Sequence, residues 1–167
     1  MSPQLDVRRS KSSATNALAT GSPVDQKQRR TRILSKPLLN RLLMAQRGTV
    51  EDVLEILMFE KIDVLVLKQS ESKGLLRRTV LLKGHSTGTH YILANSIIDL
   101  SAIPSNLGES LRDGKRGLGR LIAEMKLETF IDIRKRVSDP KTGQTYRRYT
   151  VNYNGKVAIR ISEKILV

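Results

Sequence analysis

The stretch TYRRYTVNYNGKVAIRISEKILV, residues 145–167, contains the clearest fold signal in this chain of 167 residues. Asn154-Gly155 lies between two runs rich in β-branched and aromatic residues, and Asn-Gly in that setting is the strongest short-range signal for a β-hairpin. The sequence therefore predicts two antiparallel strands, Thr145–Tyr153 and Lys156–Val167, joined by a type I′ turn.

Four further runs with the composition of strands precede this hairpin, and turn-forming residues separate most of them. They are Ile62–Gln69, Leu75–Lys83, His90–Ile98 and Leu127–Val137. A short helix pair is expected before them, because apolar residues recur at helical spacing on both sides of Gly48-Thr49. Another helical segment, from Pro104 to about Met125 and broken at Gly114 and Gly117, separates the third strand from the fourth. This order lacks a βαβ alternation and predicts an α+β fold with an antiparallel sheet.

The formal net charge of +14 is unevenly distributed along the chain. Residues 1–36 contain eight Lys or Arg and two Asp, which is close to half of the excess. Residues 1–34 also lack apolar periodicity, so we expect a disordered basic leader at 1–34 and one folded domain at 35–167. The expected location is the cytoplasm, or a plastid stroma if the leader is a transit-like targeting segment.

Composition argues against several kinds of function. No run approaches the roughly 18–20 apolar residues of a membrane span, so no membrane association and a soluble protein are expected. The chain has no cysteine and only two histidines, His85 and His90, which excludes disulfides, thiol catalysis and a multi-histidine metal site. GKRGLG at Gly114–Gly119 lacks the preceding strand and the Gly-Lys-Ser/Thr ending of a phosphate-binding loop. Aromatic residues make up 4% of the chain, so we expect weak electrostatic binding of nucleic acid through the leader but no specific binding.

Two charged residues interrupt strand faces that are otherwise aliphatic. Alternation places Arg78 on such a face of Leu75–Lys83, and it places Glu163 on such a face of Lys156–Val167. An unpaired buried charge is strongly unfavourable, so these residues are expected to be paired or used. One interpretation is an internal Arg78–Glu163 salt bridge, or a bulge that turns one of them to solvent. The other is a site in which Arg78 receives a carboxylate and Glu163 contacts a polar group or moves a proton.

Six short motifs resemble, in the same order, those of the chorismate pyruvate-lyase family, and the likeness covers about residues 38–167. They are RTVLLKG at 78–84, ANSII at 94–98, GLGR at 117–120, LET at 127–129, YRR at 146–148 and ISEK at 161–164. The nearer likeness is to a divergent branch found in cyanobacteria, plastids and some actinobacteria and archaea. This resemblance implies a six-stranded antiparallel sheet with helical flaps over an enclosed site. It also implies conversion of chorismate to 4-hydroxybenzoate and pyruvate without metal or cofactor, in the service of quinone biosynthesis.

The resemblance also assigns roles to individual residues. Arg78 matches the arginine that binds the ring carboxylate, and Glu163 matches the glutamate that contacts the ring hydroxyl. Leu118 and Val50 match positions that bind the carboxylate through backbone N–H groups. Two departures stand out: Glu51 replaces a threonine, and Asn95 replaces an arginine of the better-studied bacterial branch.

Further basic residues are candidates for the enolpyruvyl carboxylate of chorismate, namely Arg120, Arg147 and Arg148, with a solvated surface charge as the alternative for each. His85 and His90 are expected at loop or strand-edge positions rather than as catalysts. A different functional class also remains open, since a sensor or carrier that binds an aromatic carboxylate without turnover requires the same fold and an equivalent site.

Overall fold

The computed structural model describes residues 35–139 and 141–167, and the leader expected at 1–34 lies outside the described residues. The described ranges contain six strands, which form one antiparallel sheet in the order β1-β2-β3-β6-β5-β4. The strands are β1 (Ile62–Ser72), β2 (Leu75–Gly84), β3 (His90–Asp99), β4 (Thr129–Asp139), β5 (Gln144–Tyr153) and β6 (Lys156–Ile165). The predicted α+β class with a six-stranded antiparallel sheet is confirmed.

The quoted hairpin forms as β5 and β6. Asn154 and Gly155 both have positive φ values, 48° and 74°, as both central residues of a type I′ turn require. The two three-stranded halves of the sheet meet where β3 pairs with β6, with Ala94 opposite Glu163. Residues far apart in the chain therefore lie side by side in the middle of the sheet.

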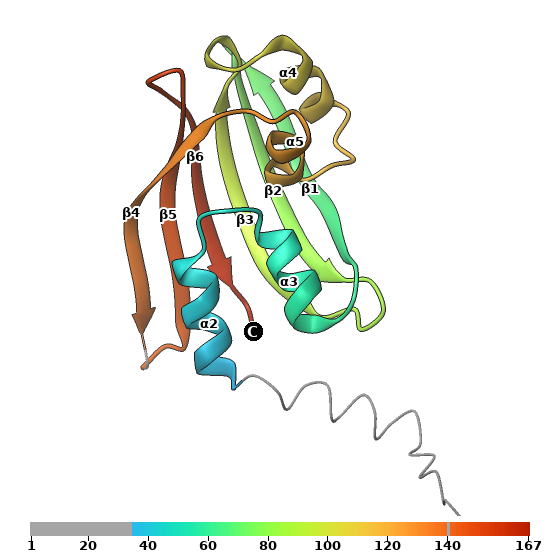
Figure 1. The fold of residues 1–167 in the computed structure, drawn as a ribbon, viewed down its shortest axis with the longest axis vertical. Coiled ribbons are helices and arrows are strands. Elements are labelled where there is room, and N and C mark those ends of the chain that lie inside the picture. Colours follow the sequence, from blue (N-terminus) through green and yellow to red (C-terminus); the bar gives the residue numbers. More distant parts are fainter. Residues whose placement is uncertain (1–34, 140) are drawn as a thin grey trace, which may run out of the picture.

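The helices of the described residues cover one face of this sheet (Figure 1). They are α2 (Lys36–Ala45), α3 (Val50–Met58), α4 (Ser105–Arg112) and α5 (Leu118–Glu124), with a short 3₁₀ helix, η1 (Leu100–Ala102), before α4. The helical segment expected at 104–125 is broken into two helices, as predicted, and Gly114 with φ 73° follows the end of α4. None of the described helices combines the length and the apolar content needed to cross a membrane.

The fourth strand begins two residues later than predicted, at Thr129 instead of Leu127. Lys126 adopts a left-handed conformation with φ 51°. The Leu127 N–H then donates to the Ile122 carbonyl at 3.1 Å, and the Lys126 N–H donates to the Ala123 carbonyl. These two bonds form a Schellman-type end to α5, so Leu127 caps the helix instead of starting the strand.

Two separate apolar cores lie between the helices and the sheet. One is formed with α2 and α3 and includes Leu39, Leu43, Leu54, Ile92 and Ile165. The other is formed with α4 and α5 and includes Leu76, Ile98, Leu107, Leu121 and Ile159. Between these two cores, the sheet carries the charged residues that the sequence singled out, Arg78 and Glu163. The helices and the sheet enclose a space at this place.

Candidate functional site

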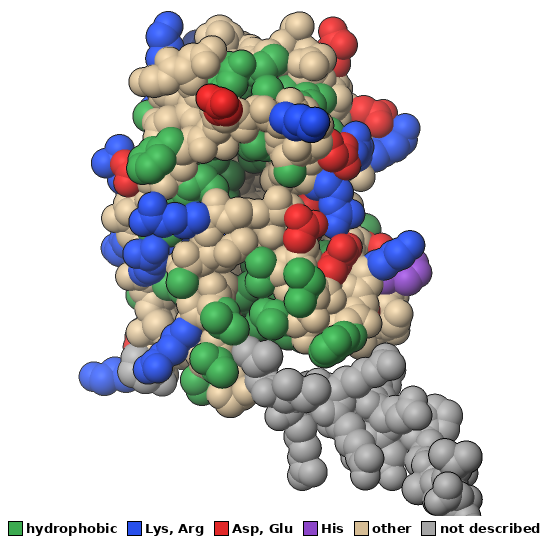
Figure 2. All heavy atoms as spheres, viewed as in Figure 1, with side chains coloured by type: hydrophobic (Ala, Val, Ile, Leu, Met, Phe, Trp, Pro, Cys, Tyr) green, Lys and Arg blue, Asp and Glu red, His purple; other side chains and the backbone are tan. Residues whose placement is uncertain are grey.

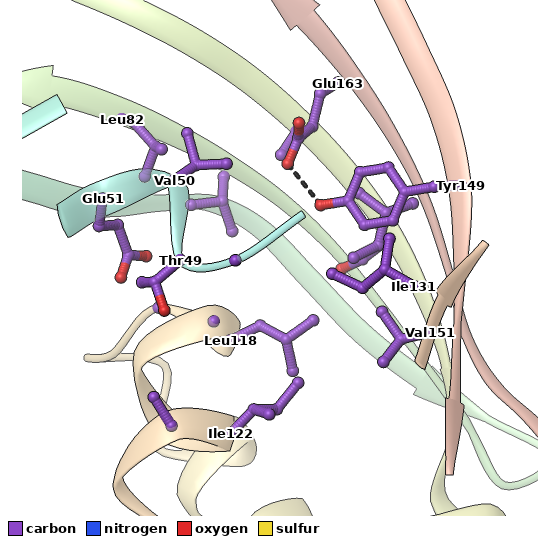
Figure 3. A pocket seen from close by; sticks show the side chains of 18 of the residues that line it. Thr49, Val50, Glu51, Leu82, Leu118, Ile122, Ile131, Tyr149, Val151 and Glu163 are labelled. Carbon is purple, nitrogen blue, oxygen red and sulfur yellow. Dashed lines mark hydrogen bonds between the residues drawn. The ribbon is translucent and has the colours of Figure 1, made fainter. Parts of the chain in front are cut away.

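A cavity of about 280 Å³ occupies the space between the two cores. Strand residues of its wall are mostly aliphatic: Val80, Leu82, Ala94, Ile131, Val151 and Ile161. Figure 2 shows the helix-covered face hollowed between the α2–α3 connection and α5. In Figure 3, Glu163 and Tyr149 face each other on the strand side, with Val50 and Leu118 across the cavity. An apolar cavity with a few polar groups is the usual form of a small-molecule site.

Arg78 projects from β2 into this cavity and is only 3% exposed. Its Nη2 donates to the carbonyl of Arg116 at 3.1 Å, while its buried Nε has no partner among the described residues. Burial lowers the pKa of this guanidinium, and the nearby charge of Glu51 opposes that shift. An arginine with a free donor beside an apolar cavity is suited to binding a carboxylate.

Glu163 projects from β6 into the same cavity but is paired with Arg147, which is 2% exposed. The Arg147 Nε donates to the Glu163 Oε2 at 2.6 Å, and Arg147 Nη1 donates to the carbonyl of Gln46. The internal Arg78–Glu163 salt bridge that the sequence allowed is therefore not formed within the described ranges. The surface alternative for Arg147 is also wrong.

Sheet register explains this choice of partner. Arg147 lies directly opposite Glu163 on the neighbouring strand β5. Arg78 lies opposite Ser96 of β3, which in turn lies opposite Ile161 of β6. Arg78 is thus two strands and two residues away from Glu163. Arg147, on the neighbouring strand, is closer and pairs with the Glu163 carboxylate instead.

Tyr149 is a cavity residue that the sequence reasoning missed. Its hydroxyl donates to the Glu163 Oε1 at 2.7 Å, and the Arg147 guanidinium lies 5.0 Å from the centre of its ring. Burial, and next the charge of Glu163, raise the pKa of Tyr149 well above 10, so the phenol keeps its proton and acts as the donor. Alternation of Tyr149 with Val151 along β5 was the signal that could have indicated its inward orientation.

Arg148 and Arg120, two of the candidates for the enolpyruvyl carboxylate, do not line the cavity. Arg148 is exposed, and its guanidinium lies 5.7 Å from the centre of the Tyr146 ring. Arg120 of α5 instead binds acidic residues of α3, with its Nη2 3.1 Å from Glu55 Oε1 and 3.3 Å from Asp52 Oδ1. Arg120 therefore joins the two helices that cover the cavity.

Val50 and Leu118 occupy equivalent positions on two different helices. Each is the first residue of its helix, α3 and α5 respectively, and each lines the cavity. The preceding residues, Thr49 and Gly117, provide no side-chain hydrogen bond to the first turns. Backbone N–H groups at the start of a helix have no intrahelical acceptor, so they are free to bind a ligand.

Glu51 is a second carboxyl group at the cavity, 5% exposed, and its Oε2 accepts no hydrogen bond within the described ranges. Burial raises the pKa of Glu51, against the opposing charge of Arg120, whose Nε lies 3.8 Å away. Its Oε1 packs so closely on Gly117 that a Cβ atom there would lie 1.7 Å from it. The sequence identified Glu51 only as a departure from the family pattern.

The remaining residues named from the sequence lie at the edge of the site or outside it. Asn95 faces the opposite side of the sheet and accepts a hydrogen bond from the Thr79 hydroxyl at 2.8 Å. Thr129 is a sheet residue, as expected, and it also lines the cavity. His85 lies after the end of β2 with its Nδ1 3.1 Å from an Asp63 oxygen, and both residues are exposed. In the part of the chain that the structure describes, no three His, Asp or Glu residues are grouped to hold a metal ion.

Comparison with known proteins shows what this chain is similar to. No protein-family model matches the chain. The curated chorismate pyruvate-lyase of Mycobacterium leprae (strain TN) is 28% identical over 104 residues, which are 54% of this chain and 50% of that protein. The predicted resemblance to chorismate pyruvate-lyase is confirmed. The match spans half the length of this lyase.

Likeness of fold extends further than likeness of sequence. The crystal structure of PhnF from Mycobacterium smegmatis superposes with a TM-score of 0.50, covering 72% of this chain and 64% of that chain. Sequence identity in this superposition is 10%, so it is a likeness of fold alone. The chain is therefore similar in sequence to a chorismate pyruvate-lyase over about half its length, and similar in fold to PhnF.

Proposed function

We propose that this protein cleaves chorismate to 4-hydroxybenzoate and pyruvate, with Arg78 binding the ring carboxylate and Glu163 contacting the hydroxyl at the opposite end of the ring. The observation that supports this most directly is that both side chains project from one sheet face into one cavity. Two strand spacings and two residues along a strand separate their Cα atoms by roughly 12 Å. That span fits a six-membered ring between two inward-pointing side chains.

Polar groups on both sides of the cavity have a task in this proposal. The unpartnered Nε of Arg78 completes a paired contact with the ring carboxylate, together with the guanidinium nitrogens beside it. The backbone N–H groups of Val50 and Leu118 bind the same carboxylate from the helix side. Glu163 accepts a hydrogen bond from the ring hydroxyl, because Arg147 and Tyr149 fix its position and each oxygen keeps a lone pair for a further bond.

The reaction needs few groups because the substrate contains most of the driving force. The bond between ring C3 and the enolpyruvyl oxygen breaks, and C4 loses a proton. The ring becomes aromatic, and the proton ends on the methylene carbon of the leaving group, which gives pyruvate. The protein therefore has to orient the substrate, neutralise its charge and exclude water. If Glu163 carries the proton between the two carbons, Glu163→Gln abolishes turnover, whereas full turnover of this variant means transfer within the substrate.

The decisive experiment is incubation of the purified full chain with chorismate in the presence of a chelator, followed by chromatography of 4-hydroxybenzoate and an enzymatic assay of pyruvate. We expect equal amounts of both products, and a large loss of kcat/KM in Arg78→Ala. Arg77→Ala is the matched control, because the neighbouring arginine is exposed and does not line the cavity. Neither turnover nor binding of 4-hydroxybenzoate by the wild-type protein would contradict the proposal.

A third outcome, binding without turnover, would point to the alternative function. Tight binding of 4-hydroxybenzoate without turnover of chorismate would favour a sensor or carrier of aromatic carboxylates. The role in quinone biosynthesis and the cytoplasmic or plastid location stay predictions.

A further inference from the structure

Chorismate has two carboxylates, and the proposed function leaves the enolpyruvyl carboxylate without a partner. We propose that Arg47, in the connection between α2 and α3, binds this second carboxylate at the mouth of the cavity and gives the site its preference for dicarboxylates. This inference rests on the proposed function. It concerns a residue that neither the motif pattern nor the sheet alternation singled out.

Arg47 and Arg78 are the two cationic side chains that line the described cavity. Arg78 is buried and lies at the end of the cavity proposed for the ring carboxylate. Arg47 is exposed and still lines the cavity, which places it at the rim and not in the interior. A ligand with one acidic group inside and a second acidic group near the opening matches this arrangement of charge.

The three arginines that the sequence suggested for this carboxylate either bind other groups or lie outside the cavity. Arg147 is bound to Glu163 and to a backbone carbonyl. Arg120 is bound to acidic residues of α3. Arg148 is exposed beside Tyr146 and does not line the cavity. Arg47, in contrast, forms no ion pair with any residue in the described ranges.

The connection that contains Arg47 and the last turn of α2 before it are each bonded to the sheet. Arg147 of β5 donates to the carbonyl of Gln46, the residue directly before Arg47. Arg136 of β4 donates through Nε to the carbonyl of Met44 at 2.9 Å. Arg147 therefore bonds both to Glu163 and to the backbone next to Arg47, so the proposed contacts to the ring hydroxyl and to the enolpyruvyl carboxylate share one anchor. Figures 1 and 2 show that the α2–α3 connection borders the hollow in the surface.

This arrangement also predicts the order in which products leave. The enolpyruvyl group lies toward the mouth, so pyruvate is formed beside Arg47 and departs first. 4-Hydroxybenzoate has one carboxylate, remains at Arg78 and makes no bond to Arg47. Removing the Arg47 charge should therefore affect the dicarboxylate substrate and leave the affinity for the monocarboxylate product unchanged.

The test compares Arg47→Ala with the wild-type chain in two measurements: KM and kcat for chorismate, and Kd for 4-hydroxybenzoate by titration calorimetry. We expect KM for chorismate to rise about tenfold, as for loss of one charged hydrogen bond at a partly exposed position, with little change in kcat. The Kd for 4-hydroxybenzoate should not change. Arg47→Lys should recover part of the KM effect, because it keeps the charge but loses the planar fork.

Arg41→Ala is the control for non-specific electrostatics, since Arg41 is an exposed arginine of α2 that does not line the cavity. It should change neither measurement. An equal loss for substrate and product, or an unchanged KM in Arg47→Ala, would overturn the role of Arg47 while leaving the lyase proposal intact. A wild-type chain that neither cleaves nor binds chorismate would overturn both.

Discussion

Replacing Arg147 by Met tests how the buried charge of Glu163 is maintained. The Arg147–Glu163 pair is almost fully buried, at 2% and 6% exposure, with an Nε–Oε2 distance of 2.6 Å. Met replaces the unbranched stem of arginine but has no charge, so Arg147→Met leaves a buried carboxylate with Tyr149 as its remaining donor. Removing one partner of a buried pair destabilises a protein by roughly 3–5 kcal/mol. This is a large part of the usual total stability of about 5–15 kcal/mol.

The assay is urea unfolding at pH 7, followed by circular dichroism, for Arg147→Met and for Arg147→Met/Glu163→Gln. The double variant removes the unpaired charge and keeps an acceptor for Tyr149, so it should be more stable than the single variant even though it contains one more substitution. A loss below about 1 kcal/mol in the single variant, the value typical of an exposed pair, would refute this reasoning. So would a double variant that is less stable than the single one.

Three further predictions concern the same cavity. Tyr149→Phe should destabilise the protein by roughly 1.5–3 kcal/mol, as expected for the loss of a hydrogen bond to a charged group, and should also lower kcat. Urea unfolding measures the first effect and product formation the second. A variant as stable as the wild type would contradict the hydrogen bond. Because burial raises the pKa of Glu51 above its usual 4.5, the free energy of unfolding should fall as pH rises through that raised pKa. Glu51→Gln should flatten this decline, and the exposed control Asp113→Asn should not. Parallel curves for the wild type and Glu51→Gln would count against the assignment. Gly117→Ala should cost roughly 1–3 kcal/mol of stability, because the added methyl group collides with the Glu51 side chain. Glu51→Ala in the same chain should relieve this loss. Purely additive effects in that double-mutant cycle would show that the two residues do not interact.

Local sequence determined most elements of this fold and two of the charged residues of the cavity. The type I′ turn at Asn154-Gly155 requires positive φ at both positions, and few residue pairs besides Asn-Gly tolerate this conformation. The hairpin could therefore be predicted from these two residues. Strand alternation placed Arg78 and Glu163 on otherwise aliphatic faces, and the structure buries both. These features depend on residues within a few positions of each other along the chain.

The partner of Glu163 depended on tertiary register. A strict continuation from the turn pair Tyr153–Lys156 would set Arg147 opposite Ser162 and turn Arg148 toward the face of Glu163. The ladder instead shifts by one residue after Asn152–Val157, passing over Ala158 on β6, so that Val151 pairs with Ile159. From there on Arg147 lies opposite Glu163, and Tyr149 also turns inward.

Arg47 and Glu51 reach the cavity for a different reason. Their positions depend on where α2, α3 and α5 pack on the sheet, and helix spacing within one segment says nothing about that placement. Periodicity in the sequence therefore determined which faces are buried, because side-chain direction along a strand or helix is a local property. Which charged groups meet in the cavity was decided by a one-residue bulge and by helix packing, since both depend on contacts between segments far apart in the chain.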